Sequence, residues 1–350
     1  MYDSTLIKLC KLHRSLIFKQ LADNVIQCQI CQRRCKIAPG EKGFCKTRKN
    51  INGELYSLTY AKVSSIRVSP IELKPLFHFY PGSKWLSLGS LGCNFLCPGC
   101  QNWEISHADI DKEIKLTEYI SPEKAVQIAI KDKCKGISWT YNEPTLSLEY
   151  TLNTAKLAKD QGLLTNYVTN GYITPETMNL LGPYLDTYRV DLKAFSSHSY
   201  KRIANISNFK GILKIIKMAK YKWNMHIEII TNLTPGYNDN EEELHAMAQW
   251  IVDQMGTETP WHITRFVPHF KLSHCDYTSI PALEQARQIG MDKGLKYVYL
   301  GNVPGHSAEN TYCPQCGELL IERQNYQILN YNLKGNECKF CNQTIAGYFE

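Results

Sequence analysis

The chain has 350 residues, of which 43% are hydrophobic and 21% charged, and its formal net charge is +7. This composition is that of a globular protein and excludes a disordered or fibrous chain, and so mild a charge indicates ordinary solubility rather than a dedicated nucleic-acid surface. No apolar stretch is long enough to cross a membrane. The apolar run Leu16–Phe18 is also too short for the core of a signal peptide.

The fourteen cysteines fall into three tight groups with metal-ligand spacing, and only Cys10, Cys134 and Cys275 stand alone. Disulfide frameworks seldom show this grouping, whereas metal sites do. Reduced thiols imply a reducing compartment, so a cytoplasmic location is expected.

Residues 1 to about 25 carry apolar side chains at three- and four-residue steps, which predicts a helix. The first cysteine group follows it and consists of Cys28, Cys31, Cys35 and Cys45. Four thiolates so close in sequence predict a metal site, which holds either zinc or an additional iron–sulfur cluster. A small segment without its own core often depends on such a metal for stability.

Two short apolar runs, Tyr56–Tyr60 and Val63–Val68, predict strands of a hairpin or extended arm that precedes the main domain. The aromatic-rich segment Ile71–Tyr80 comes next. We expect His78 to pack in the core, whereas Lys74 is left open between a core position and the active site.

From Trp85 to about Leu300, short β-rich runs alternate with longer amphipathic runs. The predicted strands are Trp85–Leu88, Gly136–Tyr141, Thr165–Thr169, Thr187–Leu192, His226–Thr231, His262–Phe266 and Tyr297–Leu300. The predicted helices are Pro122–Lys133, Leu146–Gln161, Pro175–Leu181, Phe209–Tyr221, Glu241–Gln254 and Ile280–Lys293. Three of these helices have side-chain caps in the sequence, at Ser121, Thr174 and Asn240. The alternation of strands and helices predicts parallel strands with right-handed crossovers. The segment is too short for a complete eight-fold barrel. We therefore expect an α/β fold with an open (β/α)6 TIM-like barrel.

The loop after the first predicted strand contains Cys93, Cys97 and Cys100. Three thiolates with no fourth cysteine or histidine nearby favour an iron–sulfur cube held at three corners, which leaves one iron open to a small molecule. A zinc loop completed from elsewhere in the chain is the alternative.

Polar residues follow the other strands, at the rim where barrel enzymes carry their chemistry. They are Asn142 and Glu143 after the second strand, Asn170 after the third, Asp191 and Lys193 at the fourth, and Asn232 at the fifth. Asp191 and Lys193 share one face of their strand, so they form either an internal salt bridge or a ligand site in which Lys193 meets a carboxylate and Asp191 a hydroxyl or an ion.

Near the C-terminus, Cys313-Pro-Gln-Cys316 and Cys338-Lys-Phe-Cys341 form two C-x2-C knuckles. This spacing predicts a zinc ribbon around one tetrahedral ion, with iron on the same four sulfurs as a lesser alternative. Its expected role is structural.

The cluster loop resembles the C-x3-C-x2-C motif of the radical S-adenosylmethionine (SAM) enzymes, except that Gly99 stands where the family usually has an aromatic residue before its third cysteine. The family's G-G-E-P motif appears as Tyr141-Asn142-Glu143-Pro144. The resemblance implies that Glu143 binds the SAM amino group and that Asn170 and Lys193 lie near SAM. Val168 stands where related activating enzymes often have an aspartate that helps to hold a monovalent cation.

The whole arrangement resembles the radical SAM enzyme of the AmmeMemoRadiSam system, which is related to pyruvate formate-lyase activating enzymes. The similar stretches are Cys28–Cys45, Pro70–Ser83, Gly92–Ser106, Tyr141–Leu146, Asp191–Phe195 and Gly301–Arg323. The resemblance implies a [4Fe–4S] cluster that cleaves SAM to a 5′-deoxyadenosyl radical, which abstracts hydrogen from a protein substrate. A flavodoxin or ferredoxin is the implied electron donor.

Two other functions stay open at this point. One is radical SAM modification of a small molecule or RNA, although nucleic acid is the less favoured partner. The other is a non-catalytic, zinc-bound interaction module. In all three cases we expect an N-terminal helix and four-cysteine metal-binding segment over 1–55, a radical SAM partial barrel over 56–305 and a zinc-ribbon-like module over 306–350.

Overall fold

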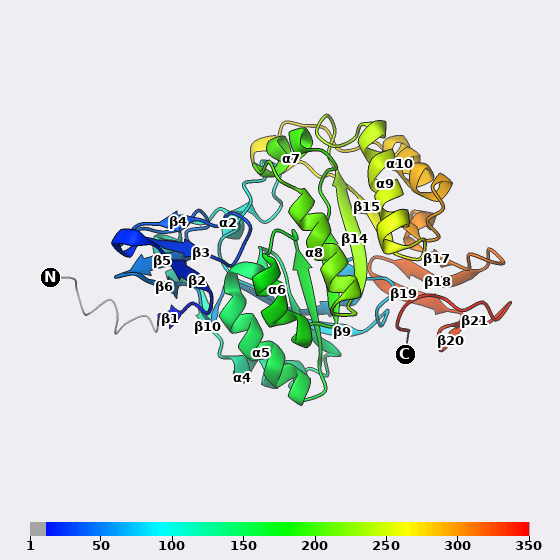
Figure 1. Cartoon of the computed structure of the whole chain (residues 1–350). Coiled ribbons are helices and arrows are strands. Elements are labelled where there is room, and N and C mark those ends of the chain that lie inside the picture. The colour runs from blue at the N-terminus through cyan, green and yellow to red at the C-terminus, as the bar shows by residue number, and fades with distance from the viewer. Residues whose placement is uncertain (1–11, 350) are drawn as a thin grey trace.

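The computed structural model describes residues 12–349, and it is built around one eight-stranded sheet (Figure 1). Seven of its strands are parallel, in the order β16-β15-β14-β13-β12-β11-β9, and β8 pairs antiparallel with β9 at one edge. The parallel strands are β9 (Lys84–Gly89), β11 (Gly136–Trp139), β12 (Leu164–Thr169), β13 (Thr187–Asp191), β14 (His226–Leu233), β15 (Trp261–Arg265) and β16 (Val298–Gly301). Each predicted strand is therefore present, and the open (β/α)6 arrangement is confirmed.

Six longer helices connect the parallel strands, as predicted. They are α4 (Pro122–Lys131), α5 (Leu148–Asp160), α6 (Pro175–Leu181), α8 (Lys210–Tyr221), α9 (Glu241–Met255) and α10 (Ile280–Asp292). Ser121, Thr174 and Asn240 each cap their helix by accepting a hydrogen bond from a backbone amide of the first turn. Figure 1 shows α5, α6, α8 and α9 in front of the strands, so their apolar faces close one side of the sheet.

Short helices occupy several connections. They are α2 (Trp103–Ser106), α3 (Ile110–Glu113), α7 (Ser197–Ala204), η1 (Ala22–Asn24), η2 (Ile71–Leu73), η3 (Ile114–Leu116), η4 (Pro144–Ser147), η5 (Gly182–Tyr184), η6 (Phe270–Leu272) and η7 (Ser307–Glu309). The sequence analysis did not predict α7, a two-turn helix between β13 and α8 that Ser196 caps by accepting from the Ser199 amide.

The N-terminal region is built of short strands, and the helix predicted over residues 1 to about 25 is wrong for residues 12–25. This region contains β1 (His13–Arg14), β2 (Phe18–Gln20), β3 (Ile26–Cys28), β4 (Lys36–Ile37), β5 (Arg48–Ile51) and β6 (Glu54–Ser57). Residues of the predicted helix form strands instead: β1 pairs with β6, where His13 lies opposite Ser57, and β2 pairs with β3, where Phe18 lies opposite Cys28. The first eleven residues of the predicted helix lie outside the described residues.

Of the two arrangements predicted for Tyr56–Tyr60 and Val63–Val68, a hairpin or an extended arm, the hairpin is wrong. β6 pairs with β5 across the Asn52-Gly53 turn and with β1, whereas β8 (Ser65–Pro70) joins the main sheet beside β9. β7 (Lys62–Val63) pairs with β10 (Glu118–Tyr119). Turn chemistry decides this outcome, because Asn52 and Gly53 both take the positive φ that a tight hairpin turn requires.

The C-terminal module comprises β17 (Thr311–Tyr312), β18 (Leu319–Gln324), β19 (Gln327–Tyr331), β20 (Leu333–Lys334) and β21 (Glu337–Cys338). In the view of Figure 1 it lies on the opposite side of the sheet from the N-terminal strands. It shares a hydrophobic core with Phe77, Tyr297 and Tyr299. No helix in residues 12–349 has the length and apolar character needed to cross a membrane.

Candidate active site at the carboxyl end of the sheet

The loop that follows β9 gathers three thiols. Cys93, Cys97 and Cys100 are all half-buried. The backbone amide of Phe95 donates to the Cys93 Sγ at 3.4 Å, and the amide of Cys100 donates to the Cys97 carbonyl at 3.3 Å. Gly92 enters the loop at a φ of +85°, and a Cβ there would lie 2.5 Å from the Thr47 side chain, so glycine is required.

Glu143 lies beside this loop and is buried. Its Oε1 accepts hydrogen bonds from the Thr145 amide at 3.0 Å and the Thr169 hydroxyl at 2.8 Å, and it also accepts from the Thr145 hydroxyl. Its Oε2 accepts only from the Asn170 amide, at 2.9 Å. Burial is the main influence on the pKa of Glu143 and raises it, and these hydrogen bonds oppose that rise. Because a carboxylate oxygen can accept two hydrogen bonds, Oε2 retains room for one further donor.

Asn170 connects Glu143 to the cluster loop. Its Nδ2 donates to the Asn94 Oδ1 at 2.8 Å and lies 3.8 Å from the Cys93 Sγ. Gly171 follows at a φ of +73°, which turns the chain after β12 and keeps Asn170 at the rim. The sequence missed Asn94, although its place inside the cysteine motif was a signal that could have identified it.

Asn142 serves the backbone of the cluster loop. Its Oδ1 accepts from the Ser90 amide at 3.0 Å and its Nδ2 donates to the Gly92 carbonyl at 2.9 Å. Tyr141, which stands where the family has a glycine, adopts a φ of +74°. The loop therefore keeps a glycine-like backbone, and the contact of Asn142 with a cofactor stays a prediction.

Asp191 and Lys193 form the internal salt bridge that the sequence allowed. The Lys193 Nζ lies 3.0 Å from the Asp191 Oδ2, and Arg189 pairs with the other carboxylate oxygen. Lys193 is near enough to Cys97 for their charges to interact. Asn232, at the end of β14, donates to the Thr264 hydroxyl at 3.0 Å and so ties β14 to β15.

Lys74 and His78 lie away from this rim. Lys74 is buried directly after η2 and donates to the Ser69 hydroxyl at 2.6 Å, and burial lowers its pKa to about 8. His78 is fully buried, as expected for a core histidine, and its Nε2 lies 2.6 Å from the Tyr299 hydroxyl.

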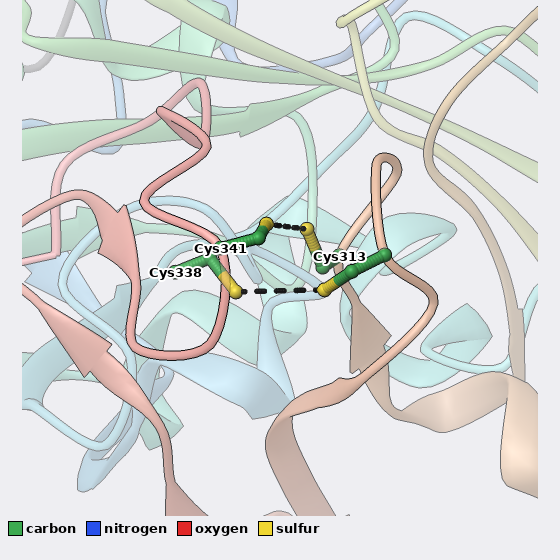
Figure 2. A group of neighbouring side chains, drawn as sticks. Cys313, Cys338 and Cys341 are labelled. Atoms are coloured by element: carbon green, nitrogen blue, oxygen red, sulfur yellow. Dashed lines mark hydrogen bonds between the residues drawn. The ribbon is translucent and has the colours of Figure 1, made fainter.

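The four C-terminal thiols converge on one point (Figure 2). The sulfur atoms of Cys313, Cys316, Cys338 and Cys341 all lie within 4.8 Å of one another. Sγ–Sγ distances are 3.6 Å between Cys313 and Cys341 and 3.8 Å between Cys316 and Cys338. A tetrahedral ion with metal–sulfur bonds of about 2.3 Å requires sulfurs about 3.8 Å apart, so these four could hold one metal ion.

The N-terminal thiols lie near the cluster loop. Cys28, Cys31, Cys35 and Cys45 line one small cavity, whose wall also includes Asn94. The segment is held in place by Gln32, whose backbone amide donates to the Tyr172 carbonyl at 2.9 Å and whose Nε2 donates to the Ile173 carbonyl at 2.8 Å. The spacing in the sequence grouped these four cysteines, but it did not indicate that they lie beside the loop that contains Asn94.

Comparison with known protein families matches residues 88–251 to the radical SAM superfamily. A protein of Methanocaldococcus jannaschii without assigned function, MJ0808, is 43% identical over 95% of this chain and 99% of its own length. The chain belongs to the radical SAM superfamily. It is thus an enzyme, and its matched region contains the three-cysteine loop, Glu143 and Asn170.

This radical SAM enzyme is also related to activating enzymes. The pyruvate formate-lyase-activating enzyme of Clostridium pasteurianum is 24% identical over 59% of this chain and 87% of its own length. Among solved structures, a radical SAM methyltransferase from Sphaerobacter thermophilus aligns with a TM-score of 0.49 at 13% identity, over 69% of this chain and 71% of its own.

The residues present fit the cofactors that the superfamily implies. Cys93, Cys97 and Cys100 supply three sulfur ligands and, within the described residues, do not crowd together as the ligands of a single ion do. Burial is the main influence on the pKa of the Cys93 thiol and raises it, and the hydrogen bond from the Phe95 amide opposes that rise. Beside them, Glu143 offers a buried carboxylate oxygen with a vacant acceptor position, which suits an ammonium group.

Proposed function

We propose that this enzyme binds a [4Fe–4S] cluster at Cys93, Cys97 and Cys100 and uses it to cleave SAM reductively. The observation that carries the proposal is the continuous contact from Cys93 through Asn170 to Glu143, which brings cluster ligands and a carboxylate to one rim. When bound, the cluster and SAM supply a 5′-deoxyadenosyl radical, which abstracts a hydrogen atom from the substrate.

The chain's own residues bind SAM and hold the loops of the site in position. Glu143 accepts a hydrogen bond from the SAM ammonium at its free Oε2 position, and Asn170 holds Glu143 and the cluster loop in register. Lys193 supplies positive charge beside Cys97. Asn142 and Asn232 fix the loops that frame the site, as their hydrogen bonds to Gly92 and Thr264 indicate.

We propose a protein as the substrate, because the relatives include activating enzymes for pyruvate formate-lyase and 4-hydroxyphenylacetate decarboxylase. A flavodoxin or ferredoxin is the proposed electron donor. Zinc is the proposed ion at Cys313, Cys316, Cys338 and Cys341, since the sulfur spacing suits its tetrahedral bonds. Thiol-bound metals require reducing conditions, which supports a cytoplasmic location.

The test measures 5′-deoxyadenosine. Protein reconstituted without oxygen is given a reductant and SAM, and wild type is compared with Cys97→Ala and with Cys134→Ala, a cysteine at the end of α4 outside the three groups. Removing an outer-shell partner of a metal costs about 10- to 100-fold, so we expect Cys97→Ala, which removes a ligand itself, to lose more than roughly 100-fold of the product and Cys134→Ala to keep it. Equal product from wild type and Cys97→Ala would rule the assignment out.

The substrate class is tested in cells. Comparing the proteomes of cells with and without the gene should reveal a protein whose mass or backbone cleavage pattern changes at one residue. A change confined to RNA nucleosides or small metabolites would contradict a protein substrate.

A further inference from the structure

The N-terminal cysteines surround one cavity. Cys28, Cys31, Cys35 and Cys45 line one cavity, and the backbone amide of Cys28 closes the β3–β4 hairpin by donating to the Cys35 carbonyl at 2.9 Å. The amide of Ile30 donates to the Cys28 sulfur, and the amide of Phe44 to the Cys35 sulfur. The two-residue spacing of Ile30 and Cys28 recurs in the C-terminal module, where the Phe340 amide donates to the Cys338 sulfur at 3.4 Å.

The spacing of these thiols does not suit a single ion. Within residues 12–349, only the C-terminal cysteines form a set of three or more ligand atoms that all lie within 4.8 Å of one another. A tetrahedral zinc ion needs sulfurs about 3.8 Å apart. The N-terminal sulfurs surround a common space but stand farther apart. An iron–sulfur cube requires this arrangement, because each thiolate binds a different iron atom.

Two buried donors at the cavity wall have no hydrogen-bond partner among residues 12–349. Arg48 is 1% exposed and its Nε is unsatisfied, and Asn94 is 0% exposed and its Nδ2 is unsatisfied. Both residues line the cavity. The Arg48 charge is already paired with Glu149, so what Arg48 and Asn94 offer to a bound cluster is their free N–H groups, which can donate to its sulfurs.

The cavity adjoins the SAM cluster loop. Asn94 lines the cavity, and it follows Cys93 directly in the chain. The Arg33 side chain, from the N-terminal segment, donates to the Asn94 carbonyl. On the outer side, Cys35 and Cys45 are partly exposed, and the exposed Lys36 and Lys46 flank them. The site therefore reaches from the protein surface to the active loop.

We infer that Cys28, Cys31, Cys35 and Cys45 bind a second [4Fe–4S] cluster, which relays single electrons to the cluster at Cys93, Cys97 and Cys100. In each transfer the N-terminal cluster is oxidised by one electron and the active-site cluster is reduced by one, and an acidic one-electron donor protein then reduces the N-terminal cluster again. The relay rests on the proposed function, whereas the second cluster does not.

Metal analysis tests the cluster. Full-length wild type purified without oxygen should contain about eight iron atoms and one zinc ion per chain, against about four iron atoms and two zinc ions if the N-terminal site binds zinc. The variant combining Cys93→Ala, Cys97→Ala and Cys100→Ala should keep about four iron atoms and an electron paramagnetic resonance signal that SAM does not change. Two zinc ions without this iron would overturn the proposal.

These results also separate the two proposals. A wild type with about eight iron atoms whose resonance signal ignores SAM would contradict the proposed function and leave the second cluster standing. A wild type with about four iron atoms and a SAM-responsive signal would support the proposed function and contradict the second cluster.

The relay is tested by combining Cys28→Ala with Cys31→Ala. With the small reductant dithionite, which reaches the open cluster directly, 5′-deoxyadenosine formation should stay within about twofold of wild type. With reduced flavodoxin it should fall at least tenfold, and raising the ionic strength should slow the wild-type reaction. Equal rates with both reductants, or equal losses with both, would contradict the relay.

Discussion

Gly99 is the residue at which this enzyme departs most visibly from its family. A Cβ at this position would lie 2.8 Å from the Phe266 ring and 3.2 Å from the Leu272 side chain. Phe266 is buried and comes from the end of β15, so it fills the space that an aromatic residue at position 99 would need. The aromatic group beside the third cysteine is thus supplied by a distant part of the chain, which no pattern around the cysteines could reveal.

The position of Phe266 beside Gly99 predicts the effect of Gly99→Tyr. The new side chain would overpack against Phe266 and should reduce the free energy of unfolding by about 1–3 kcal/mol. Denaturant unfolding measures this loss, and the double variant Gly99→Tyr with Phe266→Ala should recover part of it. If the losses in free energy of unfolding from the two single substitutions add up to the loss in the double variant, the side chains at positions 99 and 266 do not compete for one space.

At the scale of elements, one buried ion pair fastens the N-terminal strands to the barrel. Arg48, at the start of β5, lies 2.8 Å from Glu149 in the first turn of α5, and both side chains are 1% exposed. Arg48 also donates to the Leu146 carbonyl at 2.6 Å, and Glu149 accepts from the Leu16 amide at 3.0 Å. The pair thus fixes the wall of the cysteine cavity against the helix that follows Glu143.

Substituting Glu149→Gln should leave Arg48 charged and unpaired in the interior. Breaking a buried pair in this way costs about 3–5 kcal/mol of unfolding free energy. The matched control is Glu176→Gln, because the Arg34–Glu176 pair is 35% and 48% exposed and its loss should cost about 0–1 kcal/mol. Similar losses in the two variants, measured by denaturant unfolding, would refute the anchoring role of Glu149.

At the scale of the whole molecule, Glu228 joins the sheet to the C-terminal module. This buried carboxylate accepts from the amides of Phe77 and His78 at 3.0 and 2.8 Å and from the ring nitrogens of His226 and His262 at 3.0 and 2.6 Å. Burial would raise the pKa of Glu228, but the histidine hydrogen bonds outweigh it and hold that pKa well below its ordinary value. In turn, the His78 carbonyl accepts from the Tyr348 amide, so the C-terminal tail is docked on this segment.

This network predicts loss of stability in acid. Burial is the main cause that lowers the pKa of His78, to about 4. Between pH 6.5 and about 4 the unfolded chain binds a proton at this histidine that the folded chain does not, so the free energy of unfolding falls with falling pH, by roughly 3 kcal/mol. Protonation of Glu228 at still lower pH adds to the loss.

The measurement is denaturant unfolding at a series of pH values. His78→Phe should show a shallower decline between pH 6.5 and 4 than wild type, whatever its absolute stability, and substitution of the exposed His198 serves as the control. A decline of the same slope in His78→Phe would assign the acid sensitivity to other groups.

The sequence alone determined the cysteine groups, the seven parallel strands, their six connecting helices and the rim positions of Glu143 and Asn170. These features are local, because ligand spacing, helix caps and hydrophobic periodicity are set by residues near one another in the chain. The same reasoning failed for residues 12–25, where strand pairing with distant segments overrode an apparent helical period.

Only the tertiary structure decided which groups meet. It brought Phe266 onto Gly99, Arg48 onto Glu149, and the N-terminal cysteine cavity against Asn94 in the cluster loop. Each of these contacts joins residues separated by dozens of positions or more, and their meeting depends on how the strands stack and close rather than on any local pattern. Sequence spacing therefore determined which cysteines belong to one group, and packing decided which groups can act together.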